Sequence, residues 1–113
     1  MESSKITASL FDCAKKLLKF NSVEIDLGAG DGRFVYKNAL KNPENLFIAI
    51  EPGEKQMQTS IRAANRNHLE NVSFLNLSLE TLPLEVLHQS ADKLHIHFPW
   101  GSLLKFVVSP TSE

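Results

Sequence analysis

The stretch Val23-Glu-Ile-Asp-Leu-Gly-Ala-Gly-Asp-Gly32 joins a short apolar run, an acidic residue and a turn that holds three glycines. A run such as Val23–Leu27 is typical of a strand that is buried on both faces of a parallel sheet. Glycine lets the backbone bend sharply and approach a ligand closely, because it has no Cβ. The stretch therefore predicts a strand that ends in a tight turn and leads into a helix.

The rest of the chain repeats this alternation of helix and strand. Helices are predicted over about Lys5–Phe20, Arg33–Lys41 and Glu54–Asn67, after Pro83, and from Ser102 to Val108. Strands are predicted over Val23–Leu27, Leu46–Ile50, Val72–Leu75 and Leu94–Phe98. In the first helix, the residues expected to face inward are Leu10, Ala14, Leu17 and Leu18. The pattern indicates an α/β fold whose parallel sheet has the order 3-2-1-4, with helices on both faces.

Length and composition exclude several classes of protein. The chain has 113 residues, 42% of them hydrophobic, which fits one globular domain. Its one cysteine, Cys13, excludes an internal disulfide and is expected to be a small buried side chain. No apolar stretch approaches the ~20 residues that cross a membrane, and the N-terminus lacks a signal peptide, so we expect a cytoplasmic protein without a membrane partner. The Asn-x-Ser matches at Asn71 and Asn76 are then interpreted as chance.

Acidic residues gather at the predicted carboxyl ends of the strands, although the net charge is only −1. These residues are Asp26, Asp31, Glu51 and Glu80. Because the carboxyl ends of parallel strands meet at one edge, the acids are expected to surround one pocket, which suits a cationic ligand. The alternative is that a near-neutral charge is simply ordinary for an enzyme that acts on small molecules.

The glycine turn indicates a nucleotide-like ligand but not a phosphate loop. Gly28-Ala-Gly-Asp-Gly32 lacks the Gly-Lys-Ser/Thr of nucleoside triphosphatases, and Asp31 would repel a pyrophosphate. Glu51 follows the turn by about twenty residues, where an acid typically holds the two ribose hydroxyls. A solvated loop acid remains the alternative for Glu51, and a strand-end acid that caps amides remains the alternative for Asp26.

Two further groups follow predicted strands. Phe98-Pro-Trp100 places a planar side chain where a base could stack, although packing would also explain Trp100. His95 and His97 share one face of a strand, but no third ligand has a recognisable spacing, so no metal site is expected.

Four segments, taken in chain order, resemble class I S-adenosylmethionine-dependent methyltransferases. They are the glycine stretch, Ile50-Glu51, Ser78-Leu-Glu-Thr-Leu-Pro83 and Phe98-Pro-Trp-Gly-Ser-Leu-Leu104. More narrowly, they resemble the aminoglycoside-resistance enzymes that methylate N1 of a decoding-site adenine in 16S rRNA. The resemblance covers about Val23 to Leu104. It implies S-adenosylmethionine as cofactor, S-adenosylhomocysteine as product, and 16S rRNA in the 30S subunit as partner.

The resemblance also implies roles for individual residues. Cofactor binding would involve Asp26, Gly28, Ala29, Gly30, Asp31, Arg33, Glu51, Pro52, Ser78, Leu79 and Glu80. Within this set, Gly28–Asp31 would line the methionine part, Glu51 the ribose, and Ser78–Glu80 the adenine. Phe98, Pro99 and Trp100 would form the catalytic segment, with Trp100 stacking on the flipped target base.

The chain departs from this family in ways that affect the expected domain. The N-terminal hairpin of the family is not recognisable, and the family continues through further strands beyond residue 113. Residues 1–22 are interpreted as an N-terminal helix, and 23–113 as the N-terminal half of a methyltransferase domain that is truncated after the fourth strand. Strand 4 should then have an open edge and could mediate self-association. The alternatives to a 16S rRNA enzyme are a catalytically silent binding module, part of an assembly, or a methyltransferase for another RNA or a small molecule.

Overall fold

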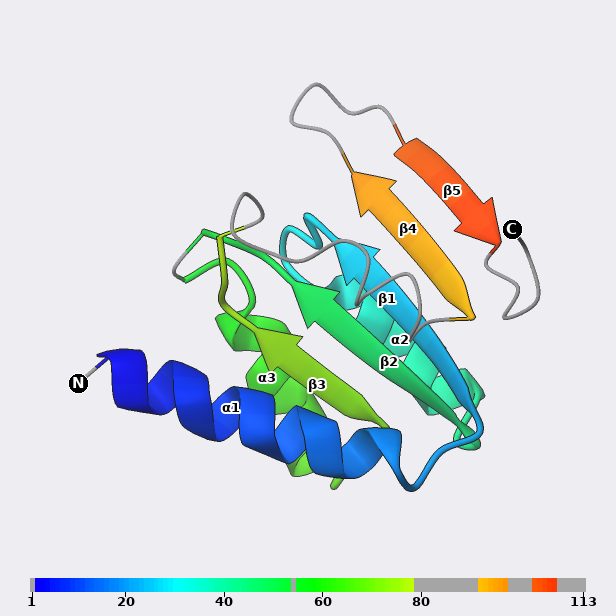
Figure 1. Cartoon of the computed structure of the whole chain (residues 1–113), viewed down its shortest axis with the longest axis horizontal. Coiled ribbons are helices and arrows are strands. Elements are labelled where there is room, and N and C mark those ends of the chain that lie inside the picture. Colours follow the sequence, from blue (N-terminus) through cyan, green and yellow to red (C-terminus); the bar gives the residue numbers. More distant parts are fainter. Residues whose placement is uncertain (1, 54, 79–91, 98–102, 108–113) are drawn as a thin grey trace.

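The fold is built around one sheet whose strand order is β3-β2-β1-β4-β5 (Figure 1). In this computed structural model, residues 2–53, 55–78, 92–97 and 103–107 are described. The helices are α1 (Glu2–Leu17), α2 (Arg33–Lys41) and α3 (Gln58–Arg66). The strands are β1 (Ser22–Leu27), β2 (Asn45–Ile50), β3 (Val72–Leu75), β4 (Lys93–His97) and β5 (Leu103–Val107).

The first four strands are parallel. β1 pairs with β2 from Ser22↔Asn45 to Leu27↔Ile50, and with β4 from Glu24↔Lys93 to Leu27↔Ile96. β2 pairs with β3 in the same direction. The carboxyl ends of these strands therefore meet at one edge of the sheet, and the predicted α/β fold with a parallel sheet is confirmed.

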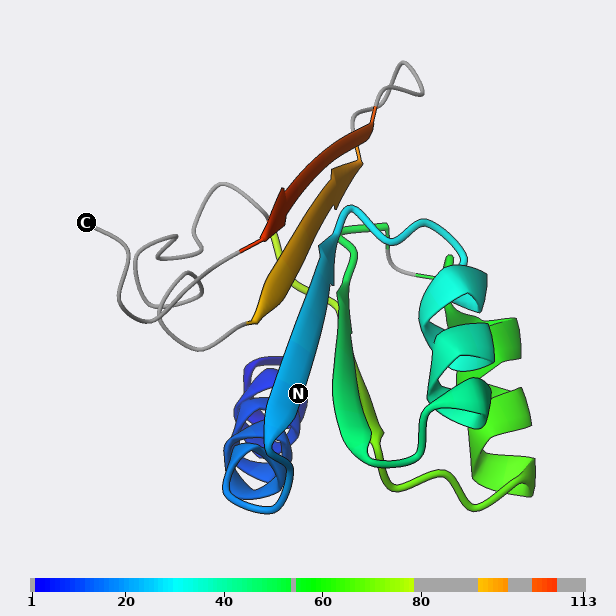
Figure 2. The same ribbon diagram turned by 90° about the vertical axis from the view of Figure 1, so that its right-hand side faces the viewer.

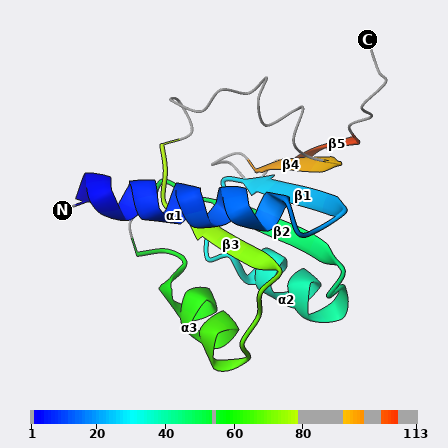
Figure 3. The same cartoon turned by 60° about the horizontal axis from the view of Figure 1, so that its bottom comes forward.

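Helices cover both faces of the sheet, as predicted. Figures 2 and 3 show α1 on one face and α2 with α3 on the other. The core on the α1 side consists of Cys13, Val23, Ile25, Leu27, Leu46, Ile48, Ile50 and Leu75. The core on the other side consists of Ala29, Val35, Ala39, Phe47, Ala49, Met57, Ala64 and Val72. β2 contributes to both cores and is apolar at every position after Asn45, whereas the apolar residues of β1, Val23, Ile25 and Leu27, all belong to the core on the α1 side.

The prediction for the inward face of α1 is partly wrong. Leu10 and Leu18 are 44% and 89% exposed, Ala14 is exposed, and Leu17 is only half-buried. Among the α1 side chains that the structure describes, Cys13 is buried in the core, at 6% exposed as expected for that residue, and Leu17 packs against the same core. The helix also ends at Leu17, because the amides of Leu18 and Lys19 bond three residues back in a tight final turn.

The predicted helix from Ser102 is wrong, since Leu103–Val107 forms the strand β5, antiparallel to β4. The register sets Leu94 opposite Phe106, Ile96 opposite Leu104, and His95 opposite Lys105. Apolar and polar positions therefore match along both strands, which is the period of a strand and not of a helix. The expectation of an open β4 edge is also wrong, because β1 and β5 flank β4.

Lys16 connects α1 to β3, the outermost strand on its side of the sheet. Its Nζ donates to the carbonyl oxygen of Val72 at 2.6 Å and lies 3.7 Å from a carboxylate oxygen of Asp12.

None of the described helices has the length and apolar character that crossing a bilayer requires. The helix predicted after Pro83 lies outside the described residues.

Candidate functional site

The glycine turn after β1 is held against the end of β2. The amides of Gly28 and Ala29 donate to the carbonyl oxygen of Ile50 at 2.8 and 3.1 Å. Gly28, Gly30 and Gly32 all have positive φ, between 61° and 76°, which only glycine adopts without strain. The turn therefore depends on its glycines, and it lies with the loop after β2 at the carboxyl edge of the sheet (Figure 2).

Glu51 joins the two loops. Its Oε1 accepts the amide of Gly30 at 2.7 Å, and its Oε2 accepts the amide of Gly53 at 2.9 Å. Its own amide donates to the carbonyl oxygen of Leu75, which extends the parallel ladder one residue beyond β2. A carboxylate oxygen has two lone pairs, so each oxygen can accept one further hydrogen bond. Glu51 is thus fixed by the protein and can still bind two hydroxyl groups.

Asp26 lies beneath this junction, near the end of β1. Its side chain is only 1% exposed. Burial, together with the smaller effect of the nearby charge of Glu51, raises the pKa of Asp26 to about 7. Asp26 therefore keeps its proton well above the pH at which an ordinary aspartate loses it.

Asp31 supports the start of α2 and is itself held by Ser60. The Oδ1 of Asp31 accepts the amide of Arg33 at 3.0 Å, which supplies an acceptor for one of the free amides at the helix start. The buried hydroxyl of Ser60, on α3, donates to the carbonyl oxygen of Asp31 at 2.7 Å. The conformation of the glycine turn is therefore linked to the position of α3.

The structure brings together several of the predicted residues and leaves others outside the described part. Gly28, Ala29, Gly30 and Glu51 meet through the hydrogen bonds above, and Asp26 lies close to Glu51. Exposed residues beside them are Asp31, Arg33, Pro52 and Ser78. The predicted residues Leu79, Glu80, Phe98, Pro99 and Trp100 lie outside the described residues.

Three contributors were missed by sequence reasoning. Gly53 donates to Glu51, Ser60 fixes Asp31, and the Nδ2 of Asn76 donates to the carbonyl oxygens of Glu51 and Gly53 at 2.8 and 3.2 Å. Position gives one signal for Asn76, since it directly follows a strand, as Glu51 does. Ser60 gives none, because it occupies an ordinary inward position of a helix.

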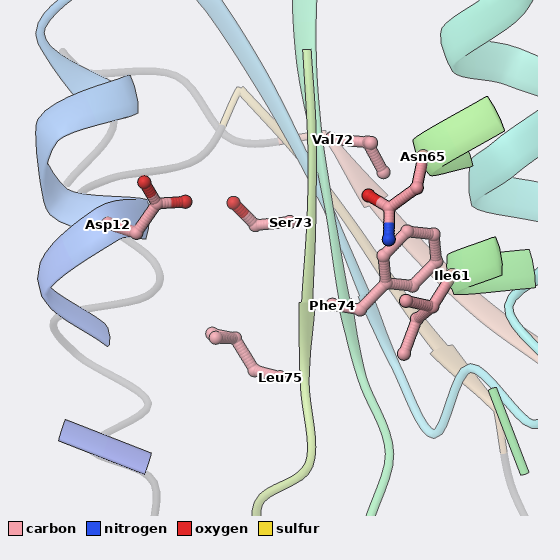
Figure 4. A pocket seen from close by; sticks show the side chains of 7 residues that line it. All are labelled: Asp12, Ile61, Asn65, Val72, Ser73, Phe74 and Leu75. Atoms are coloured by element: carbon pink, nitrogen blue, oxygen red, sulfur yellow. The ribbon is translucent and has the colours of Figure 1, made fainter. Parts of the chain in front are cut away.

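A hollow of about 370 Å³ lies elsewhere, along the outer edge of β3 between α1 and α3 (Figure 4). It is lined by Asp12, Ile61, Asn65, Val72, Ser73, Phe74 and Leu75. Figure 4 shows Ser73 and Leu75 directed toward the α1 side of the strand, and Val72 and Phe74 toward α3. The hollow contains none of the predicted cofactor-binding residues and follows from the position of β3 at the edge of the sheet.

Residues 3–113 match the family model of NpmA, a 16S rRNA (adenine(1408)-N(1))-methyltransferase. The chain belongs to this family. A 16S rRNA (adenine(1408)-N(1))-methyltransferase of Escherichia coli is 37% identical over 99 residues, which are 84% of this chain and 45% of that protein. The chain therefore spans less than half the length of this relative. The predicted resemblance to this family is confirmed.

Solved structures agree with this assignment. The 30S ribosomal A1408 methyltransferase from an uncultured bacterium has a TM-score of 0.68 and 44% identity, covering 79% of this chain and 43% of that one. A W203A mutant of the 16S rRNA (adenine(1408)-N(1))-methyltransferase from Catenulisporales acidiphilia, solved with the cosubstrate SAM, has a TM-score of 0.63 and 31% identity. It covers 79% of this chain and 45% of that one. The methyltransferase-like α/β fold is thereby shown.

Proposed function

We propose that this chain supplies the cofactor-binding half of an S-adenosylmethionine-dependent methyltransferase that acts on N1 of adenine 1408 in 16S rRNA of the 30S subunit. The observation that carries the proposal is the hydrogen bond between the Gly30 amide and Glu51, in a chain that belongs to this family. That bond places the glycine turn and the expected ribose acceptor side by side.

The residues present fit this cofactor. A Cβ built on Gly30 would meet nothing within 4 Å, so the backbone borders open space where a ligand can approach. Gly28–Asp31 would hold the methionine part, with Arg33 and the buried Asp26 beside it, and Glu51 with Pro52 would hold the ribose. The acids match the positive charge of the sulfonium. Ser78, Leu79 and Glu80 would hold the adenine.

The proposed chemistry requires positioning more than proton transfer. The bound cofactor supplies an electrophilic methyl group. Adenine N1 has a lone pair in the plane of the ring, so the protein needs no general base to activate it. The residues described above would orient the cofactor, and Trp100, with Phe98 and Pro99, would hold the exposed base by stacking. A tryptophan face also stabilises the positive charge of the methylated base.

The proposal also places the chain within a larger fold and a compartment. Residues 23–113 would form the N-terminal half of the methyltransferase domain, in which the parallel strands keep the order 3-2-1-4 and residues 1–22 precede them. Because bacterial ribosomes work in the cytoplasm, a 16S rRNA substrate places the protein there.

A paired measurement tests the proposal. Calorimetry with S-adenosylhomocysteine and transfer of labelled methyl to 30S subunits should both give a signal, and the label should map to adenine 1408. Binding without methyl transfer would favour a catalytically silent binding module. Label on another RNA would identify that RNA as the substrate. Tight binding of NAD, with no binding of S-adenosylhomocysteine, would contradict the proposed methyltransferase function.

A further inference from the structure

Asn76 directly follows β3 and connects two of the loops at the carboxyl edge of the sheet. Its Nδ2 lies 2.8 Å from the carbonyl oxygen of Glu51 and 3.2 Å from that of Gly53. One side-chain amide therefore bridges both ends of the Glu51-Pro52-Gly53 loop. The residue has no place in the cofactor contacts proposed above, and its sequence context suggests only a chance Asn-x-Ser match.

The Glu51-Pro52-Gly53 loop has no free backbone donor of its own. Pro52 has no N–H, the amide of Glu51 donates to Leu75, and the amide of Gly53 donates to the Oε2 of Glu51. Both backbone donors between Glu51 and Gly53 are thus already used. The carbonyl oxygen of Gly53 also receives the amide of Gln56 at 3.3 Å, whereas that of Glu51 receives the Asn76 amide at the shorter distance of 2.8 Å.

The same loop carries the carboxylate that holds the glycine turn. Glu51 Oε1 accepts the Gly30 amide at 2.7 Å, so a shift of the loop would move this oxygen relative to Gly30. Asn76 thus acts on the backbone of Glu51, and Glu51 acts through its side chain on the turn after β1. The loop after β3 is thus linked to the loop after β2, which is in turn linked to the loop after β1.

We propose that Asn76 is a positioning residue that fixes the Glu51 carboxylate for the glycine turn and for the ribose of the cofactor. The part that concerns the ribose rests on the proposed function. The role requires the two N–H groups of an amide, because both partners are carbonyl oxygens that only accept. Aspartate has the same shape but would set a carboxylate oxygen against these carbonyls.

Two measurements on the full chain test the role, one of them without ligand. In Asn76→Ala, hydrogen exchange at the Gly30 and Gly53 amides should become roughly three- to tenfold faster, the factor expected for one neutral hydrogen bond. The Gly28 amide, which donates to Ile50, should keep its rate. Affinity for S-adenosylhomocysteine should fall by a similar factor, and Asn76→Asp should show the same losses.

Asn67→Ala is the matched control. The Nδ2 of Asn67 also donates to a backbone carbonyl, that of Ala63 at 2.9 Å, but it lies at the end of α3 and not at the site. This variant should leave both the exchange rates and the affinity unchanged. If Asn76→Ala fails to fold, Asn76→Ser retains one donor, and its Gly30 exchange should lie between wild type and Asn76→Asp.

Unchanged Gly30 exchange in the Asn76 variants would overturn the proposal. So would unchanged affinity in a chain whose wild type binds S-adenosylhomocysteine. If the wild type does not bind that ligand, the proposed function fails, and the Gly30 exchange rate still decides the positioning role.

Discussion

The carboxylate of Glu51 serves the protein as well as a ligand, because it holds the amides of Gly30 and Gly53. Glu51→Ala should therefore weaken binding of S-adenosylhomocysteine by at least tenfold, since each hydrogen bond to a charged acceptor contributes ~1.5–3 kcal/mol. Calorimetry measures the change. Glu44→Ala, an exposed acid just before β2, is the control that should bind normally. An unchanged affinity for Glu51→Ala would place the ribose elsewhere.

Asp26 should make the stability of the chain fall as pH rises. Its pKa is raised from 3.8 to about 7 by burial and by Glu51, so between these values the folded state keeps a proton that the unfolded state has lost. The free energy of unfolding then decreases by up to about 1.4 kcal/mol per pH unit across this window. Urea denaturation at pH 5 and pH 8 measures the difference.

Asp26→Asn should remove this contribution, because an amide does not titrate in the window. Glu24→Gln, on the same strand, should keep most of the wild-type slope. An Asp26→Asn variant with the full wild-type pH dependence would show that another group is responsible.

At the scale of elements, the turn between β1 and α2 distinguishes two glycines. Alanine at either Gly30 or Gly32 must adopt a positive φ, which costs roughly 1–2 kcal/mol. At Gly32 the new Cβ would also lie 3.1 Å from the Phe74 ring and 3.3 Å from Met57, whereas at Gly30 it meets nothing within 4 Å. Gly32→Ala should therefore lose about 1–3 kcal/mol more stability in urea titrations.

Gly30→Ala should instead affect the ligand. Its Cβ would project into the open space proposed for the methionine part of the cofactor, so affinity for S-adenosylhomocysteine should fall more than stability does. Equal stability losses for the two variants would mean that the space around Gly32 relaxes. Normal affinity in Gly30→Ala would move the cofactor away from this turn.

Elements with clear start and stop signals could be predicted from the sequence. Helix α2 has the predicted bounds because a glycine turn precedes it and Asn42-Pro43 follows it. Helix α3 begins later than predicted, at Gln58, since residues 55–57 form a turn. The nature of β5 was missed, because short apolar runs fit both periods and tertiary pairing decides between them.

Prediction of the candidate site from the sequence has the same limit. Strand ends and glycines predicted that Gly28–Gly30 and Glu51 meet, because parallel topology alone brings them to one edge. Asn71 and Asn76 have the same Asn-x-Ser signature, yet the amide of Asn71 donates to the carbonyl oxygens of Ala39, Asn42 and Asn45, far from the site. Such bridges depend on the paths of loops, which residue patterns do not specify.

For the whole molecule, the proposed function separates binding of the cofactor from transfer to RNA. β4 runs parallel to β1, so it ends at the same edge as the glycine turn, and Trp100 follows it by three residues. Trp100→Ala should leave affinity for S-adenosylhomocysteine nearly intact. Methyl transfer to 30S subunits should fall by roughly five- to 150-fold, since stacking on one base contributes ~1–3 kcal/mol. Equal loss of binding and transfer would identify Trp100 as a packing residue.

The contact between Lys16 and the Val72 carbonyl has a consequence for the behaviour of the protein at high concentration. An outermost strand offers a template on which strands of other molecules can add and grow into aggregates. The ammonium of Lys16 occupies one acceptor of that template, so an incoming strand would have to displace a charge. Lys16→Met should therefore aggregate at lower concentration and temperature in light scattering than Lys15→Met, which alters an exposed position of the same helix. Equal scattering of the two variants would show that Lys16 does not protect this edge.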